Sequence, residues 1–545
     1  MKKRHAHKEN ILLVNITRLG DMLQATPTIT GMKQENPDAK ITVLVEKQFD
    51  EVCHFLPDID EVVSIDLGMT VRSLAREEEG IIDAYEYVDE FVNNLRGKNF
   101  DYCLNMSSSA YTALLLRTLG IKRRGGWASD EEGYRIIESD WARLFATSVF
   151  HQNRQFNSLN LVDIFRCSAD VEKHPNKLQI KILPEALEYV DGLISQHGFT
   201  NTGPLISIQA GASQGKRQWA PENFIRLINY LTTKENARIV LTGSKKELDI
   251  INPILAGTDK KNVMLAVGRT SIPQLAALLN RSAVLVTGDT GPMHVSVAAG
   301  TPVISLFLAS AFGFETGPYS EGNIILQPVI GCGPCNPNKS CARPDCHFHI
   351  EPENLAKLVA IRAREDIKTL PEGLFDPNKV VVYRSFFDEY GFCDLKALSN
   401  NSSDYFVPYR SAYRKLWMED IGGYKLPEMK KSMLRSRIEA VDGISSIVTQ
   451  ADQGIQEIKR LVSLISNPNV TPSEFGKVSD SIQEVDVEIE NLGFHHPHLG
   501  PLARMYCFAK ENIQGNDPIS LAKQTLANYE DLKRRSISFS QILQG

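Results

Sequence analysis

The sequence predicts an α/β fold of two consecutive domains followed by a mostly helical region. Short apolar runs alternate with helical segments from residue 11 onward and again from residue 206, as they do when helices connect parallel strands. After about residue 365 this alternation stops and helix-forming sequence dominates. We therefore expect domains at 1–195 and 200–365 and a helical extension at 376–545.

The first domain is expected to begin with an apolar strand over Ile11–Ile16 and one helix over Met22–Asn36. Further strands are predicted at 41–45, 62–65, 101–105 and 177–183, with helices at 81–95 and 184–196. The second domain repeats the pattern with strands at 206–210, 238–242, 263–267, 283–287 and 303–307, and helices at 221–231, 247–255, 272–279 and 292–299. Ligands of open parallel sheets bind at the carboxyl ends of the strands, so two such domains are expected to face a cleft.

Residues 290–314 carry no formal charge and are long enough for a membrane span. Glycine and proline divide the stretch, however, at Gly291, Pro292, Gly300 and Pro302. We therefore expect a short helix followed by a buried strand and no transmembrane segment.

The helical extension contains two start signals. Thr471-Pro-Ser-Glu474 fits a capping box with proline at the first helical position. Asp517-Pro518 is expected to begin a last helix that runs to Leu543. This region is interpreted as a helical bundle for packing or for partner contact, including oligomerisation.

The composition is that of a soluble globular protein, with 42% hydrophobic and 23% charged residues. The net charge of −6 argues against a nucleic-acid-binding domain. The basic start MKKRHAHKEN has no following apolar region typical of a signal peptide. It is either a solvated tail or a weak contact for an anionic inner leaflet. Nine cysteines without an export signal predict reduced thiols in the cytoplasm.

Two polar turns follow predicted strands. In Arg18-Leu-Gly-Asp21 the aspartate is placed near a helix start, where it either caps the helix or accepts a proton from a substrate hydroxyl. The loop GASQGKRQW exposes backbone amides and carries Lys216 and Arg217, which suits a diphosphate. The alternative is an ordinary basic surface loop, and the spacing is not that of a P-loop.

Two further turns have the same placement. Glu247 either accepts from ribose hydroxyls or complements a helix dipole. In Thr287-Gly-Asp-Thr-Gly-Pro-Met-His294, the amides at Thr290 and Gly291 begin a helix and form an anion site. Asp289 is then placed to bind sugar hydroxyls, and His294 to donate to an oxygen or simply to pack.

Four cysteines lie within a short segment, at Cys332, Cys335, Cys341 and Cys346. Four thiols can hold zinc or iron tetrahedrally. The spacing is compact and only one pair has the Cys-x2-Cys form, so a thiol-rich loop without metal is the alternative.

The ordered motifs RLGDMLQATPTI, IQAGASQGKRQWAPENF, IVLTGSKKE and VTGDTGPMHVSVAAGTPVISLF resemble glycosyltransferase family 9, which includes lipopolysaccharide heptosyltransferases. The resemblance spans roughly residues 9–365. It implies a GT-B architecture with the acceptor in the first domain and the donor in the second. It also implies inverting transfer of a heptose from an ADP-activated donor, with no cofactor required for catalysis.

By position, Asp21 corresponds to the catalytic base and Arg18 lies on the acceptor side. Lys216 or Arg217 corresponds to the basic group on the donor phosphate; Arg217 holds the place two residues before tryptophan. Glu247 corresponds to the ribose contact. The donor segment comprises Asp289, Thr290, Gly291 and His294.

The implied acceptor is a lipid-linked or core saccharide of lipopolysaccharide, met in the cytoplasm or at the cytoplasmic face of the inner membrane. Three alternatives stay open. They are a protein hydroxyl as acceptor, another nucleotide sugar as donor, and a sugar-nucleotide-binding scaffold without catalysis.

Overall fold

The computed structural model describes the chain except for residues 1–8, 77–78, 400–403 and 468. Most of the predicted basic tail therefore lies outside the described residues. The chain packs as two compact units. The first comprises Met1–Ser108, Thr118–Arg124 and Leu159–Ser402, and the second comprises Ser109–Arg117, Gly125–Ser158 and Ser403–Gly545.

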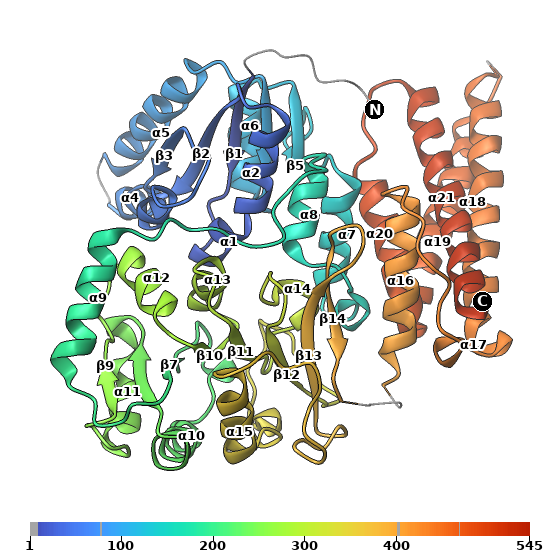
Figure 1. Cartoon of the computed structure of the whole chain (residues 1–545). Coiled ribbons are helices and arrows are strands. Elements are labelled where there is room, and N and C mark those ends of the chain that lie inside the picture. Colours follow the sequence, from blue (N-terminus) through green and yellow to red (C-terminus); the bar gives the residue numbers. More distant parts are fainter. Residues whose placement is uncertain (1–8, 77–78, 400–403, 468) are drawn as a thin grey trace. The chain divides into compact units, whose positions relative to one another are not determined.

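The first unit contains a parallel sheet in the order β3-β2-β1-β4. Its strands are β1 (Asn10–Val14), β2 (Lys40–Glu46), β3 (Glu61–Ile65) and β4 (Tyr102–Asn105). The central strand β1 is apolar and buried from Ile11 to Val14 because helices cover both of its faces. The nearby helices are α1 (Leu19–Gln24), α2 (Thr26–Glu35), α3 (Asp50–Cys53), α4 (Leu67–Leu74), α5 (Gly80–Arg96) and α8 (Leu161–Ser168), whereas α9 (Pro184–His197) packs against the second sheet (Figure 1).

Two details of the first domain differ from the prediction. The single helix expected at 22–36 is two helices that meet at Ala25, since Pro27 has no amide hydrogen to continue α1 and lies instead in the first turn of α2. The prediction of a strand at 177–183 is wrong. The segment bonds outside any sheet, from Gln179 N to Thr26 Oγ1 (3.1 Å) and from Lys181 N to Phe55 O (2.8 Å).

The second sheet of the first unit has the order β14-β13-β12-β11-β10-β7-β8-β9. Six strands are parallel: β7 (Leu205–Gln209), β8 (Arg238–Thr242), β9 (Val263–Leu265), β10 (Val284–Gly288), β11 (Val303–Leu306) and β12 (Ile324–Pro328). The last two, β13 (Val380–Phe387) and β14 (Cys393–Ala397), are antiparallel. They lie in the region predicted to be mostly helical, and the β-branched run Val380–Val382 favours a strand there.

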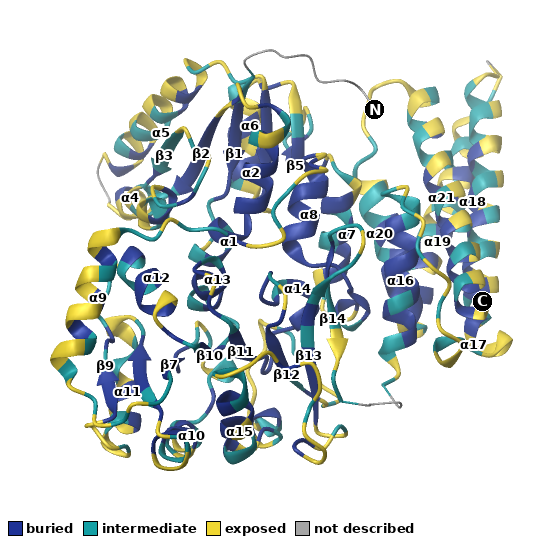
Figure 2. Ribbon diagram, viewed as in Figure 1, coloured by how far each residue is buried: buried dark blue, intermediate teal, exposed yellow. Residues whose placement is uncertain are grey.

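Two cores hold helices against the second sheet. One packs α10 (Pro221–Lys234), α11 (Leu248–Ala256) and α15 (Pro352–Arg362) on one face, and the other packs α9 and α12 (Ile272–Asn280) on the opposite face. Figure 2 shows these strands buried between their helices. Each fully buried Leu or Ile contributes about 1.5–3 kcal/mol relative to exposure. This covered sheet holds the loops at its carboxyl edge in place.

Residues 290–314 form separate elements, as predicted. They contain α13 (Gly291–Ala298), β11 and the start of α14 (Gly313–Thr316). Among the residues that the structure describes, no helix combines the length and the apolar character needed to cross a membrane.

The second unit is mainly helical. Its helices are α6 (Ala110–Leu119, up to Arg117), α7 (Asp140–Val149), α16 (Phe406–Asp420), α17 (Arg437–Val441), α18 (Ile444–Ile465), α19 (Pro472–His495), α20 (Gly500–Glu511) and α21 (Pro518–Gln544). The capping box at Thr471 and Glu474 is confirmed, and the helix predicted after Asp517 is present. An antiparallel pair, β5 (Arg123–Ser129) with β6 (Arg135–Ile137), completes the unit, and Ile137 N donates to Asn512 Oδ1 of the tail (3.0 Å).

Candidate functional site

Helix α1 of the first sheet and helix α13 of the second pack against each other within the first unit. An added Cβ at Gly20 would lie 2.7 Å from His294 Cδ2, and one at Gly291 would lie 3.1 Å from Leu19 Cδ2. The two helices therefore approach at glycines on both sides. The contact brings the turn after β1 next to the turn after β10.

Asp21 lies in the first turn of α1 and accepts from the amide of Arg18, with 3.1 Å from N to Oδ2. The capping interpretation is thus correct for its geometry. Burial raises the pKa of the Asp21 carboxyl above its ordinary value of 3.8, while Thr17 and Arg18 oppose the rise and the charge of Asp289 adds to it. A carboxylate with a raised pKa is a stronger base, so capping and proton acceptance are compatible.

Asp289 and Arg217 form an ion pair at the carboxyl edge of the second sheet. Arg217 Nη1 lies 2.9 Å from Asp289 Oδ2, and both side chains are largely buried. Arg217 Nε donates to Ser310 Oγ (2.7 Å), and Thr316 Oγ1 donates to Asp289 Oδ1 (3.2 Å). Arg217 is thus held with its guanidinium at the start of α13, where free amides favour an anion.

Lys216 points elsewhere. Its Nζ donates to the carbonyl oxygens of Asn336 (2.8 Å), Pro337 (3.0 Å) and Lys339 (2.7 Å). The sequence did not decide whether Lys216 or Arg217 is the phosphate ligand. Of the two, the structure brings only Arg217 together with Asp289.

Glu247 is engaged by its own loop. Its Oε2 accepts from Ser244 N (2.6 Å) and Ser244 Oγ (2.8 Å), and its Oε1 accepts from Gln209 Nε2 (2.7 Å). An added Cβ at Gly211 would lie 1.6 Å from Oε1, so the glycine makes room for the carboxylate. Each carboxylate oxygen can accept further bonds, and the ribose contact of Glu247 stays a prediction.

His294 is 4% exposed, and burial lowers the pKa of its imidazole to about 4. The ring is therefore neutral at pH 7. Thr290 caps α13 with extended backbone, and its hydroxyl lies 3.0 Å from that of Thr287. His294 packs against Gly20, as the simpler interpretation of its role had it.

The structure does not show the predicted metal site at the four clustered cysteines. Among the described residues, no group of three or more His, Cys, Asp or Glu side chains is arranged to hold a metal ion. Cys332 and Cys341 are exposed whereas Cys346 is buried, and burial together with the neighbouring thiol of Cys332 raises the pKa of Cys335 to about 11. Backbone contacts order the loop instead, among them Cys335 N to Ala309 O (2.9 Å).

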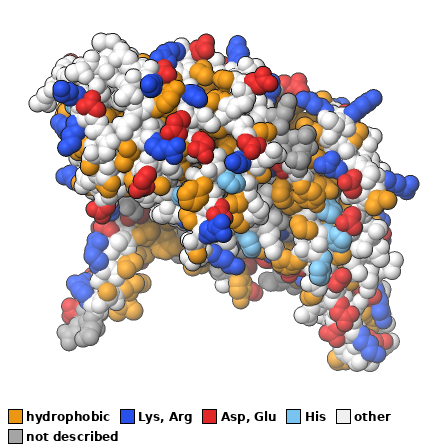
Figure 3. All heavy atoms as spheres, turned by 90° about the horizontal axis from the view of Figure 1, so that it is seen from below, with side chains coloured by type: hydrophobic (Ala, Val, Ile, Leu, Met, Phe, Trp, Pro, Cys, Tyr) orange, Lys and Arg blue, Asp and Glu red, His pale blue; other side chains and the backbone are white. Residues whose placement is uncertain are grey.

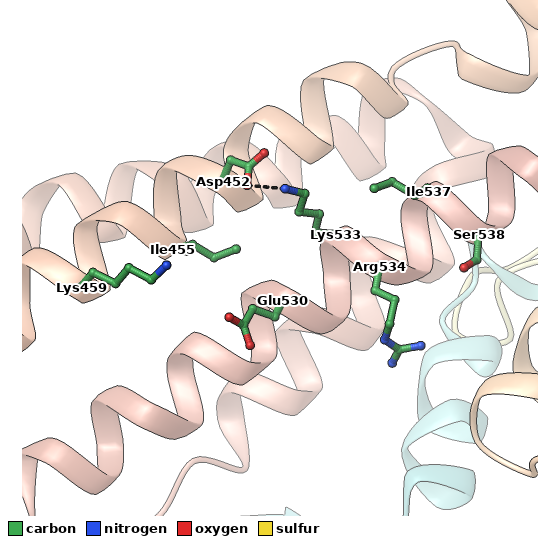
Figure 4. Close-up of a pocket in the computed structure, with 8 residues that line it drawn as sticks. All are labelled: Asp452, Ile455, Lys459, Glu530, Lys533, Arg534, Ile537 and Ser538. Carbon is green, nitrogen blue, oxygen red and sulfur yellow. Dashed lines mark hydrogen bonds and ion pairs between the residues drawn. The ribbon is translucent and has the colours of Figure 1, made fainter.

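A groove in the second unit lies apart from the predicted site residues. It has a volume of about 520 Å³ and lies between α18 and α21 (Figure 4), lined by Asp452, Ile455, Lys459, Glu530, Lys533, Arg534, Ile537 and Ser538. Lys533 Nζ pairs with Asp452 Oδ1 at 2.7 Å across it. Basic and acidic side chains are also intermingled on the face seen in Figure 3, which shows no single-sign surface there.

Ser310 and Thr316 contribute to the site but were not predicted from the sequence. They follow β11, and polar residues beyond the carboxyl end of a buried strand were the signal that could have found them. Gln209, the last residue of β7, was missed for the opposite reason: it lies inside a predicted strand.

Two α/β domains with parallel sheets, in contact through the turns after β1 and β10, have the GT-B architecture found in glycosyltransferases. Residues 88–344 match the family model described as Glycosyltransferase family 9 (heptosyltransferase). The matched region includes Arg217, Glu247 and Asp289 and begins after Asp21.

Curated relatives are similar over the same part of the chain. Lipopolysaccharide heptosyltransferase 3 of Escherichia coli is 25% identical over 311 residues, covering 56% of this chain and 84% of the relative. Lipopolysaccharide core heptosyltransferase OpsX of Haemophilus influenzae is 24% identical, covering 62% and 88%. A family 9 glycosyl transferase from Veillonella parvula superposes with a TM-score of 0.52 at 19% identity, covering 66% of this chain and 99% of that structure, which supports the fold.

Proposed function

We propose that this glycosyltransferase moves a heptose from an ADP-activated donor to a hydroxyl of a lipopolysaccharide inner-core saccharide. The names of the curated relatives support the sugar and the acceptor class. The observation that carries the donor site is the pair of Arg217 and Asp289 at the start of α13. An acceptor of this kind would be met at the cytoplasmic face of the inner membrane.

In the proposed reaction Asp21 accepts the proton of the acceptor hydroxyl as its oxygen attacks the anomeric carbon. The bond from that carbon to the ADP oxygen breaks, and configuration inverts. Negative charge develops on the departing diphosphate, where Arg217 and the amides at Thr290 and Gly291 stabilise it. Arg18 is exposed at the start of α1 and is proposed to contact the acceptor.

Asp289 has two roles in this scheme. Without donor, its carboxylate neutralises Arg217 across 2.9 Å. When a diphosphate arrives, the guanidinium can bind it while keeping Asp289 as a second partner, because its five N–H donors form a fork. Asp289 then offers its remaining lone pairs to sugar hydroxyls. Glu247 is proposed to accept from the ribose with the lone pairs that Ser244 and Gln209 leave free.

The helical tail is proposed to be a packing module first. Arg410 Nε donates to Gln155 O (3.1 Å), and Arg414 Nη1 donates to Ser158 O (2.6 Å), both from α16 to the segment before Leu159. Removing the tail would leave these buried carbonyls without their donors. A role in oligomer or partner contact would come in addition to this packing.

The experiment is a transfer assay with ADP-heptose and three acceptors: a lipid-linked inner-core saccharide, the delipidated saccharide and a serine-rich protein. The products are analysed by mass spectrometry. We expect one heptose added to the saccharides and an equal amount of ADP released. If heptose were added to the protein alone, the acceptor would be a protein hydroxyl and not a saccharide. ADP-heptose that is neither bound nor consumed would contradict it.

A further inference from the structure

The ammonium group of Lys216 is fully occupied by backbone carbonyls. Nζ donates to Asn336 O, Pro337 O and Lys339 O over 2.8, 3.0 and 2.7 Å. A lysine ammonium has three N–H donors and no more. Lys216 therefore has no donor left for a phosphate oxygen while these bonds are made.

The three carbonyls belong to the segment with the clustered cysteines, residues 332–349, here termed the cysteine loop. The loop also returns to Lys216, because His347 Nε2 donates to Lys216 O (2.8 Å) and Trp219 Nε1 donates to His347 O (3.1 Å). His347 is 7% exposed and Trp219 is 2% exposed. Buried hydrogen bonds of this kind fix both segments firmly against each other.

The cysteine loop also reaches the residues that hold Arg217. The amide of Cys335 donates to Ala309 O (2.9 Å), and the next residue, Ser310, accepts from Arg217 Nε (2.7 Å). Ser310 Oγ in turn donates to Gln214 Oε1 (3.2 Å), in the same turn as Lys216. Arg217 therefore stands between two segments that the cysteine loop ties together.

We infer that Lys216 is a positioning residue, which anchors the cysteine loop and thereby orients Arg217 toward the donor diphosphate. The inference rests on the proposed function, since Arg217 is the phosphate ligand there. It gives the neighbouring lysine a separate role, although both residues are basic and adjacent. It also gives the cysteine loop a function that needs no metal ion.

The chemistry of the two side chains favours this division. A lysine ammonium is a compact point charge whose three donors can satisfy three separate carbonyl dipoles. An arginine guanidinium is planar, so it binds a phosphate well but does not fit three carbonyls that surround a point. Replacing Lys216 by arginine should therefore preserve a phosphate contact and disrupt an anchor.

The test compares the wild-type chain with Lys216→Met, Lys216→Arg and Lys234→Met, the last as a control that removes an exposed positive charge from the end of α10. Titration with ADP and donor-dependent kinetics are measured for each. For both Lys216 variants we expect about tenfold weaker ADP binding, the size of one charge-assisted hydrogen bond. The KM for donor rises accordingly, and kcat at saturating donor falls as well, because the displaced Arg217 stabilises less of the charge that develops on the departing diphosphate.

Hydrogen exchange provides a readout that does not depend on activity. In Lys216→Met we expect faster exchange at the amides of Cys335 and His347, and unchanged exchange in β7 and β8. Full ADP affinity in Lys216→Arg would overturn the inference, because it indicates a direct phosphate contact. Unchanged exchange in the cysteine loop of Lys216→Met would overturn it as well.

Failure of the inference can be told apart from failure of the proposed function. If Arg217→Met loses ADP binding while Lys216→Met behaves as wild type, Lys216 does not position Arg217 and the donor site stands. If the wild-type chain does not bind ADP, the donor site itself is wrong and the inference falls with it.

Discussion

Arg217 donates from Nη1 to Oδ2 of Asp289 over 2.9 Å, across two loops at the carboxyl edge of one sheet. The pair places the Arg217 guanidinium at the start of α13. Because the site is largely buried, the carboxylate of Asp289 provides that guanidinium with a counter-charge. Replacing Arg217 by methionine should weaken ADP binding by about 10- to 100-fold, the range of a lost charge-assisted hydrogen bond. Binding of adenosine, which has no phosphate, should change far less. Equal losses for both ligands in calorimetric titrations would contradict a phosphate role.

Asp21 should control turnover more than donor binding. Asp21→Asn keeps an acceptor for the Arg18 amide but cannot take a proton, so we expect kcat to fall about 10²–10⁴-fold with ADP affinity retained. Steady-state kinetics and ADP titration of the same preparation check both halves. Transfer at the wild-type rate would remove Asp21 from the mechanism.

The raised pKa of Asp21 predicts how rate and stability depend on pH. Because the base must be deprotonated, kcat/KM should rise with pH through a pKa above 3.8. For stability the sign is the opposite. The folded state holds this proton more tightly than the unfolded chain, so stability is lost as pH rises from 3.8 through the folded-state pKa. Asp21→Asn should therefore have a higher Tm than wild type at pH 7, and the difference should vanish near pH 3.8. A lower Tm at pH 7 would show that the burial penalty is not the dominant contribution.

The close approach of α1 and α13 should be sensitive to one methyl group. In Gly20→Ala the new Cβ would lie 2.7 Å from His294 Cδ2, so the helices must separate and Asp21 moves away from the donor loop. We expect kcat to fall at least about tenfold, since small displacements of a catalytic group are costly. Gly192→Ala in α9 is the matched control, because its added Cβ meets nothing within 4 Å. Equal activity of the two variants would argue against the tight contact.

A buried ion pair in the first unit should matter for stability. Asp163 and Arg166 in α8 are 0% and 1% exposed, and Asp163 also accepts from Tyr319 OH (2.8 Å) and Cys393 N (2.9 Å). Asp163→Ala leaves a buried guanidinium without its carboxylate, for an expected loss of about 3–5 kcal/mol in the free energy of unfolding. Asp191→Ala, which breaks an exposed pair with Arg281, should cost under about 1 kcal/mol. Similar denaturation midpoints for the two variants would contradict this difference.

The sequence predicted the parallel sheets well because their strands are apolar on both faces and their helices begin at proline or capping residues. The strand prediction for residues 177–183 failed because this segment satisfies its amides with a side chain and a backbone carbonyl outside any sheet. The turns that carry Asp21, Arg217 and Asp289 could be found since each follows a strand. Which of Lys216 and Arg217 lies beside Asp289 could not be predicted, because Lys216 is held by carbonyls of Asn336, Pro337 and Lys339, about 120 residues away. The metal site at the four cysteines stays a prediction, since among the described residues no group of three or more His, Cys, Asp or Glu side chains is arranged to hold a metal ion.

The central claim is that the Arg217–Asp289 site binds an ADP-activated heptose. Calorimetric titration of the full chain with ADP-heptose, UDP-glucose and GDP-mannose tests it most directly. We expect saturable binding of ADP-heptose at one site per chain, lost in Arg217→Met, and little binding of the other two. Preferential binding of UDP-glucose or GDP-mannose, or ADP-heptose binding that Arg217→Met leaves intact, would contradict it.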